Sequence, residues 1–473
     1  MKIKKYINLS LILLLAGLIY SCSGDNIING ESPLDPDTGG GDTKGEQTTL
    51  SMFFGQSDDL NTKSASNPDA TAESQIYSLD ILIFKSGGGA DQGKIDTYIH
   101  KPRTIKSVPG QTEEYNVITE VRDIVLTIGR RDIYVIANAP DSPNGFFHGK
   151  TTLAQFKAEV EKLSDQRLIP HPGTIVPGGD DEDPIGGINP SDLKTNLTMM
   201  GYFDAQFTTA KHHYLGYTDP GGLPSHAISG GAALDPNTNP FYLERLAARV
   251  AVKKIKFDFS ASSNLVFESG YPAVGPNDYT YQLDSVFMLN VKTGSRYHIP
   301  QSATDSKLTG NFGYGCLKGY NYLKTTVGMT NLTGIEADYL TEPIFSREYD
   351  IAVNSTPIWF YAFENDATEN YPTYLVIGVR YNFKSSKDQK FKTAKYYYPV
   401  IVNKPGSGSS THNYIKRNNQ YFISATIRQL APTVSTPVEL KSAIDSDMYD
   451  NIIEVEEEVG TNLFPWTGNK YNK

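Results

Sequence analysis

The chain has 473 residues and a formal net charge of −10, from 43 Lys and Arg against 53 Asp and Glu. Its length allows two or three domains with a sizeable buried core. No basic cluster follows a groove-like pattern, so nucleic acid is excluded as an expected partner. The 30 tyrosines, 41 glycines and 27 prolines indicate many short strands and turns.

The first 21 residues predict a signal peptide. Three lysines among the first five residues precede a short apolar run over residues 11–19. That run is too short for a membrane span. Ser21-Cys22 resembles a bacterial lipobox, in which the cysteine is acylated and becomes the new N-terminus. A plain secretory signal, cut near Ser21, is the alternative.

Residues 22–46 are rich in Gly, Asp, Pro and Ser, which predicts a flexible tether. The second cysteine, Cys316, stands alone. If Cys22 is lipidated, no intramolecular disulfide can form. Stability is then expected to come from core burial.

Residues 48–54 predict the first strand. Leu50, Met52 and Phe54 share one face by the two-residue period of a strand. If this strand were removed, the neighbouring strands would lose their contacts with its apolar face.

The polar stretch of residues 55–69 suits an exposed loop. Lys63 is the only basic residue between Gln47 and Phe84. A trypsin-like protease would therefore cut between Lys63 and Ser64 and detach the first strand. The alternative is an ordinary edge strand followed by a solvated loop.

The rest of the chain is mainly β in composition. Residues 133–139 are almost continuously apolar, which predicts a central strand buried on both faces. Residues 129–132 read as a tight turn. Further strands are predicted at residues 77–85, 123–128, 197–203, 243–259, 281–291, 357–363, 373–383, 395–402 and 420–430.

Within residues 243–259 the apolar register changes by one residue, which predicts a bulge or a break near Lys253. A helix competes for the first half of this segment, which is rich in Ala and Leu.

The clearest helix is predicted at residues 151–164, capped by Thr151 or Thr152. Its apolar positions at helical spacing are Leu153, Phe156, Val160 and Leu163.

Two long loops interrupt the pattern. Residues 169–190 contain the acidic run from Asp180 to Asp183, which lacks the ligand spacing of an EF-hand. A solvated acidic loop is the default and calcium binding the alternative. Residues 218–240 are full of Gly, Pro and Asn and form the best candidate for a domain boundary.

The sequence lacks the motifs of common catalytic sites: a phosphate-binding Gly-rich loop, HExxH, CxxC and GxSxG. His212 and His213 are adjacent and would face opposite ways in a strand. Asp and Glu are abundant, but nothing singles out a glycosidase pair. No enzyme activity, cofactor or metal is therefore expected. A monomeric surface lipoprotein that stacks glycans on Tyr or Trp stays open as an alternative.

Seven segments occur in order behind the lipobox. They are YSLDILIF at residues 77–84, RDIYVIANA at 131–139, the helix at Leu153, LTMMG at 197–201, ERLAARVAV at 244–252, FYAFEN at 360–365 and IKRNNQYFISATI at 415–427. Taken together, these segments resemble the fimbrillins, the type V pilins of Bacteroidales. The resemblance covers most of the chain after the tether.

The resemblance implies a mainly β protein with two β-sandwich-like (transthyretin-like) domains and a few short helices. The implied boundaries are residues 47–240 and 241–430, with residues 431–473 as a C-terminal donor segment. It also implies export as a lipoprotein to the outer membrane and assembly into a cell-surface fimbrium that supports adhesion. Its partners would be other fimbrial subunits and a trypsin-like maturation protease. The resemblance leaves open whether this chain is a shaft, tip or anchor subunit.

In the family, a protease removes the first strand, and a C-terminal strand of another subunit fills the groove. Carried over, residues 48–54 would be removed by a cut at Lys63, where the family usually has Arg. The donor would be the strand around Ile453, Val455 and Val459, which share one face. Glu457 interrupts that face and must find a partner or lie where the groove opens. The alternative is an edge strand of its own domain.

Overall fold

The computed structural model describes most of the strands and their connections. The described residues are 45–54, 75–106, 114–162, 168–170, 193–195, 197–215, 228–234, 242–259, 264–292, 294–298, 314–317, 325–329, 358–365, 372–405, 414–432, 452–460 and 466–467. They are almost entirely strand, with one short helix, which confirms the predicted mainly β fold class.

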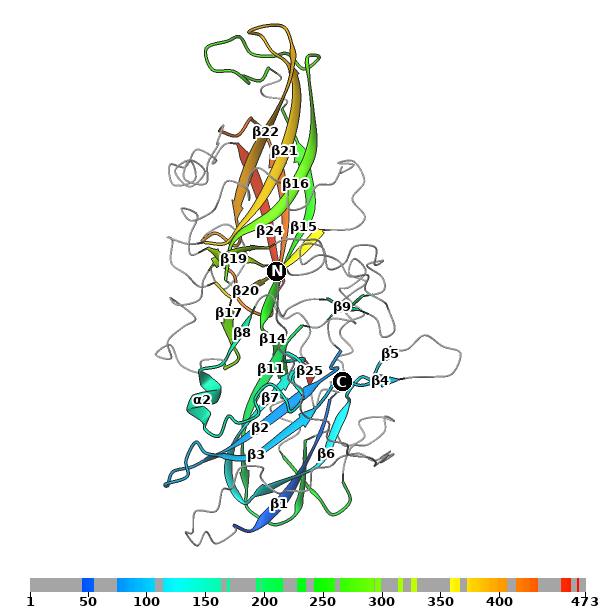
Figure 1. The fold of residues 1–473 in the computed structure, drawn as a ribbon, viewed down its shortest axis with the longest axis vertical. Helices are drawn as coiled ribbons and strands as arrows, with labels where there is room; N and C mark the ends of the chain where they lie inside the picture. Colours follow the sequence, from blue (N-terminus) through cyan, green and yellow to red (C-terminus); the bar gives the residue numbers. More distant parts are fainter. Residues whose placement is uncertain are drawn as a thin grey trace, which may run out of the picture. The chain divides into compact units, whose positions relative to one another are not determined.

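A six-stranded sheet in the order β25-β14-β11-β7-β2-β3 is built largely from the N-terminal half of the chain (Figure 1). Its strands are β2 (Leu79–Ser86), β3 (Ile95–Lys101), β7 (Gly129–Ala137), β11 (Met199–Phe207), β14 (Tyr242–Arg245) and β25 (Trp466–Thr467). The apolar stretch Ile133 to Ala137 of β7 is buried between β2 and β11, as its lack of alternation predicts.

A four-stranded sheet has the order β13-β12-β1-β6. Its strands are β1 (Gln47–Phe53), β6 (Glu120–Thr127), β12 (His212–Leu215) and β13 (Ala232–Ala233). Apolar side chains of this sheet and of the six-stranded sheet share one core, which includes Leu50, Ile81, Ile124, Val135 and Met199.

The C-terminal half forms two further sheets, β20-β15-β23-β24 and β19-β18-β16-β21-β22. The first contains β15 (Ala247–Phe257), β20 (Ile358–Phe363), β23 (Gln420–Ile427) and β24 (Ile453–Gly460). The second contains β16 (Tyr279–Lys292), β18 (Tyr314–Leu317), β19 (Thr325–Met329), β21 (Tyr374–Lys384) and β22 (Phe391–Ile401).

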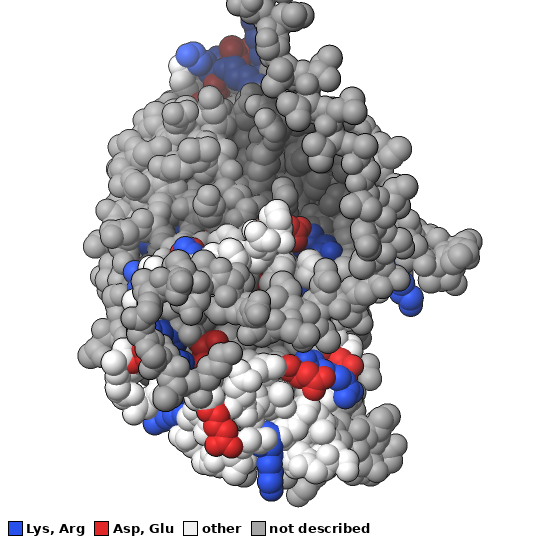
Figure 2. All heavy atoms as spheres, turned by 60° about the horizontal axis from the view of Figure 1, so that its bottom comes forward, with Lys and Arg blue, Asp and Glu red and all other residues white. Residues whose placement is uncertain are grey.

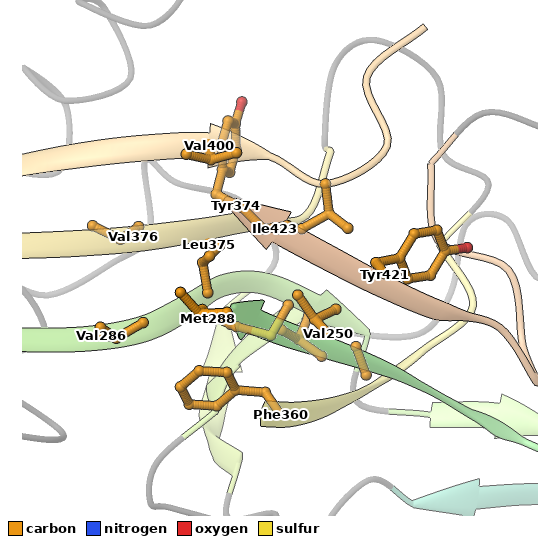
Figure 3. Close-up of a cluster of buried hydrophobic side chains, with 14 of the residues drawn as sticks. Val250, Val286, Met288, Phe360, Tyr374, Leu375, Val376, Val400, Tyr421 and Ile423 are labelled. Carbon is orange, nitrogen blue, oxygen red and sulfur yellow. The ribbon is translucent and has the colours of Figure 1, made fainter. Parts of the chain in front are cut away.

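Side chains from both of these sheets meet in a second core (Figure 3). Val250, Phe360 and Ile423 come from the first sheet, and Met288 and Leu375 from the second. All five are buried. Burial of such side chains contributes about 1.5–3 kcal/mol each and holds the two sheets together.

The bulge predicted near Lys253 is confirmed. The pairing of β15 with β23 shifts register between Val252 and Lys254. The competing helix prediction is wrong, because Tyr242–Arg245 and Ala247–Phe257 are both strands that pair with neighbours.

Two local predictions are also wrong. The expected turn at residues 129–132 is the start of β7, where residue 129 pairs with β11 and residues 130–132 pair with both β2 and β11. The helix α2 covers only Leu153–Lys157, with Thr152 as its N-cap in a capping box. It stops early because Val160–Lys162 forms β8 and pairs with β17 (Gly294–Arg296). Leu163 lies outside the described residues.

Short strand pairs complete the described structure. They are β4 (Ile105–Lys106) with β5 (Glu114–Tyr115), and β9 (Leu168–Pro170) with β10 (Leu193–Thr195). Residues 42–473 form one compact unit. The predicted division near residue 240 stays a prediction.

Candidate functional site

The first strand, β1, lies inside its sheet and not at an edge. It pairs in parallel with β12, where Leu50 lies opposite His213, and antiparallel with β6, where Leu50 lies opposite Ile124. Both rows of its backbone groups are therefore bonded. If β1 were absent, β12 and β6 would each present an unpaired edge toward the other.

Both faces of β1 are covered. Leu50, Met52 and Phe54, which the sequence places on one face, are buried in the core between the two N-terminal sheets. On the other face, Phe53 is buried beneath the guanidinium of Arg122, 5.0 Å from the ring centre. Each fully buried apolar side chain contributes about 1.5–3 kcal/mol, so β1 fills a tight slot.

The slot also contains a buried polar contact. Leu50 lies opposite Ile124 and Met52 lies opposite Val121 in the pairing of β1 with β6. Two residues of β6 therefore lie opposite the single residue Ser51. This bulge includes Asp123, whose φ is 58°. The Asp123 backbone N–H donates to Ser51 Oγ at 3.1 Å. Ser51 thus satisfies a donor that the bulge removes from the strand ladder.

His212 completes this contact from the opposite strand. Its Nε2 lies 2.9 Å from Ser51 Oγ, and its Nδ1 lies 3.7 Å from Asp123 Oδ1. The order Ser-His-Asp is that of a hydrolase triad. Ser51 is 0% exposed within a strand paired on both sides, so no substrate could reach its hydroxyl. The contact fixes β1 in its slot.

As predicted from their adjacency, the two histidines of β12 face opposite ways. His212 reaches Ser51, whereas His213 is buried with its ring edge-on to Phe207 at 4.9 Å. Sequence reasoning missed the role of Ser51 and His212. They are 161 positions apart, and only the parallel pairing of β1 with β12 brings them together.

The predicted donor strand is found as β24, at the edge of its own sheet. It pairs antiparallel with β23, with Ile453 opposite Ile427, Val455 opposite Ala425 and Val459 opposite Tyr421. Ile453 is buried in the C-terminal core and Val455 packs against it. This is the position expected from the alternative prediction, an edge strand of its own domain. Within its sheet, β24 pairs through one side of its backbone only.

The opposite face of β24 is acidic. Glu454 and Glu456 are exposed. The Arg428 guanidinium, from the residue that follows β23, donates to Glu454. Both partners are about half exposed, so this ion pair contributes little to stability. Charge on this face opposes pairing with a second copy of the same strand.

Glu457 on the apolar face does find a partner. The backbone N–H of Asn403 donates to both of its carboxylate oxygens at 2.9 Å. Burial nevertheless dominates and raises the pKa of Glu457 to about 7, while the Asn403 hydrogen bond opposes the rise. At neutral pH the carboxylate is therefore partly ionised in a poorly solvated place.

The final described strand, β25, pairs with β14 at the edge of the N-terminal six-stranded sheet. Leu243 lies opposite Trp466 and Tyr242 opposite Thr467. Residues after β24 therefore reach a different sheet from β24 itself.

Other predicted site residues lie outside the described residues. These are Cys22, Lys63, Ser64 and the acidic run Asp180 to Asp183. The backbone of Cys316 lies in β18. Within the described ranges, no three His, Cys, Asp or Glu side chains gather closely enough to hold a metal. No described helix has the length and apolarity to cross a membrane.

Charge on the described surface is mixed. In the view of Figure 2, acidic and basic side chains are interspersed over the described part of the face. Exposed ion pairs of the described residues include Arg130 with Asp204 at 2.6 Å and Arg122 with Glu120 at 2.8 Å.

One segment of the chain matches a known protein family. Residues 48–176 match the family model described as major fimbrial subunit protein (FimA). This match starts at β1 and confirms the fimbrillin resemblance drawn from the sequence. The family consists of structural fimbrial subunits, which are not enzymes. Such subunits form cell-surface fimbriae together with other fimbrial subunits. No curated protein matches the chain.

Solved structures give further similarities. The chain is similar to a fimbrilin (fimA) from Porphyromonas gingivalis W83, at 18% identity and a TM-score of 0.47, covering 89% of this chain and 98% of that one. It is similar to a putative cell adhesion protein from Parabacteroides distasonis, at 15% identity and a TM-score of 0.48, covering 89% and 100%. A fimbrial assembly protein from the same species has 11% identity and a TM-score of 0.34, covering 81% and 91%.

Proposed function

We propose that this chain, a member of the major fimbrial subunit family through residues 48–176, polymerises by exchange of strands between copies. Cleavage after Lys63 releases β1, and the C-terminal segment of another subunit takes its place. The precursor is exported as a lipoprotein through Cys22, and the fibre supports adhesion.

The placement of β1 is the observation that carries this proposal. Strand β1 lies between β12 and β6 and fills both backbone rows and an apolar slot. It is joined to β2 through residues 55–74, which include Lys63. A cut in that connection would leave β1 held by non-covalent contacts alone. Loss of the strand would create two facing unpaired edges, which a strand of similar pattern can satisfy.

Strand β24 has the properties that a donor needs. Its apolar residues Ile453 and Val455 alternate with acidic residues, as Leu50 and Met52 alternate with polar residues in β1. It is an edge strand, so its release breaks pairing with only β23. The partly ionised Glu457 weakens its docking at neutral pH.

Mild trypsin treatment of the purified precursor tests the proposal. Wild-type protein is expected to be cut after Lys63, to expose Ser64 as the new N-terminus and to form fibres visible by electron microscopy. The matched control is Lys63→Gln, which keeps the loop's length and polarity but removes the cleavage site. It should stay monomeric under the same treatment. Fibres from uncut Lys63→Gln protein, or a wild-type protein that is cut and stays monomeric, would contradict the proposal.

A further inference from the structure

We propose that the Asp123 backbone N–H and His212 form a carboxylate-binding site that selects the register of the incoming strand, and that Glu454 of a second copy is its ligand. This inference rests on the proposed function and specifies which residue of β24 takes the place of Ser51. It concerns the Asp123 N–H and the His212 imidazole, which strand removal would leave without the Ser51 hydroxyl as their partner.

The site is defined by what Ser51 does in the precursor. Its hydroxyl accepts from the Asp123 N–H at 3.1 Å and lies 2.9 Å from His212 Nε2. The bulge geometry at Asp123 turns that N–H away from the regular ladder. A strand that replaces β1 must therefore bring an acceptor in its side chain at this position, because backbone carbonyls of a regular strand do not reach it.

The pattern of β24 has one position that fits. Ser51 is flanked by Leu50 and Met52, which are both buried in the apolar core. In β24, Glu454 is flanked by Ile453 and Val455. Glu456 has an apolar residue on one side only, since Glu457 follows it, and the same is true of Glu458.

The register that places Glu454 at Ser51 brings Glu457 to Phe54, at the end of the slot, where the side chain is 6% exposed. If β24 runs in the direction of β1, Ile453 takes the place of Leu50, Val455 that of Met52 and Glu457 that of Phe54. Phe54 is the last described residue of the slot, after the end of β1. A shift by two residues would instead bury Glu457 at the position of Met52, which is 0% exposed. An unpaired charge there is costly.

Chemistry favours a carboxylate over the hydroxyl that it replaces. A backbone N–H and an imidazole N–H both donate to carboxylates, and hydrogen bonds to an ionised acceptor are stronger than neutral ones. The Asp123 carboxylate is 62% exposed, so its repulsion is screened by solvent. Glu454 is also available, because its partner Arg428 holds it only through an exposed ion pair.

The test compares fibre formation by full-length protein cleaved after Lys63. The variants are Glu454→Gln, His212→Ala, their double variant and Glu456→Gln as the matched control. Loss of one charged hydrogen bond is expected to raise the concentration needed for fibres about tenfold in Glu454→Gln. His212→Ala should behave alike, and the double variant should be no worse than either single variant. Glu456→Gln should resemble wild type.

Arg428→Gln separates binding from release. It breaks the same ion pair in the monomer as Glu454→Gln but keeps the carboxylate, so fibres should form at least as readily as in wild type. Equal fibre formation by Glu454→Gln and Glu456→Gln, while wild type polymerises, would overturn this inference and leave the proposed function intact. If cleaved wild-type protein stays monomeric, both fail.

Discussion

Replacing Glu457 with Gln should make the docking of β24 insensitive to pH. The pKa of Glu457 rises from its ordinary value of 4.5 to about 7 because burial disfavours the charged form. The pKa of Glu457 is higher in docked β24 than in the released strand, so the docked strand binds more protons between these two pKa values. The stability of docking is therefore highest below about pH 4.5 and falls as the pH rises to about 7.

The size of this loss follows from the two pKa values. They differ by about 2.5, from 4.5 to about 7, and each pKa unit corresponds to about 1.4 kcal/mol. The penalty above pH 7 is therefore about 3 kcal/mol. Gln keeps an oxygen that can accept from the Asn403 N–H but carries no charge, so the penalty disappears.

Hydrogen exchange of the backbone amides of residues 452–460 measures this effect. Wild type and Glu457→Gln are compared at the same pH, so that the intrinsic exchange rate cancels. At pH 8 the variant should be protected about a hundredfold more, and at pH 5 the two should differ far less. Glu456→Gln is the control, since Glu456 is exposed. Equal protection of wild type and Glu457→Gln at pH 8 would refute the reasoning.

Three further outcomes are expected. Arg131→Ala should lower the free energy of unfolding by about 3–5 kcal/mol, because it removes the charged partner of buried Asp96 at 2.7 Å and leaves only the hydrogen bonds from Thr127. Arg130→Ala removes an exposed pair and should leave denaturant unfolding nearly unchanged. Equal effects of the two substitutions would contradict this reasoning. Leu50→Ala should destabilise the precursor by about 2–5 kcal/mol in the same assay, yet leave fibres formed after cleavage unaltered, because β1 has left. Cys22→Ala should abolish incorporation of a fatty-acid analogue in cells, and undiminished labelling would rule out that lipid site.

Periodicity alone predicts much of the fold. The continuous apolar run in β7 indicates its central position, and the register change near Lys253 indicates the bulge in β15. These features depend on which side chains face the core, which the sequence records directly. The face shared by Leu50, Met52 and Phe54 is predictable for the same reason.

Pairing between distant segments is less visible. The helix predicted over residues 151–164 stops at Lys157 because Val160 pairs with Arg296, and tertiary pairing overrides helical spacing. The contact of Ser51 with His212 depends on a parallel pair of strands that no local signal specifies. The alternation in β24 suits either its own sheet or a slot in another copy, so the pattern does not choose between them.

The most direct test of strand exchange is a high-resolution reconstruction of fibres grown from protein cleaved after Lys63. The account predicts that β1 is absent and that β24 of the next subunit lies between β6 and β12, with Glu454 beside His212. A fibre that retains β1 in this slot, or that keeps each β24 paired with its own β23, would contradict it.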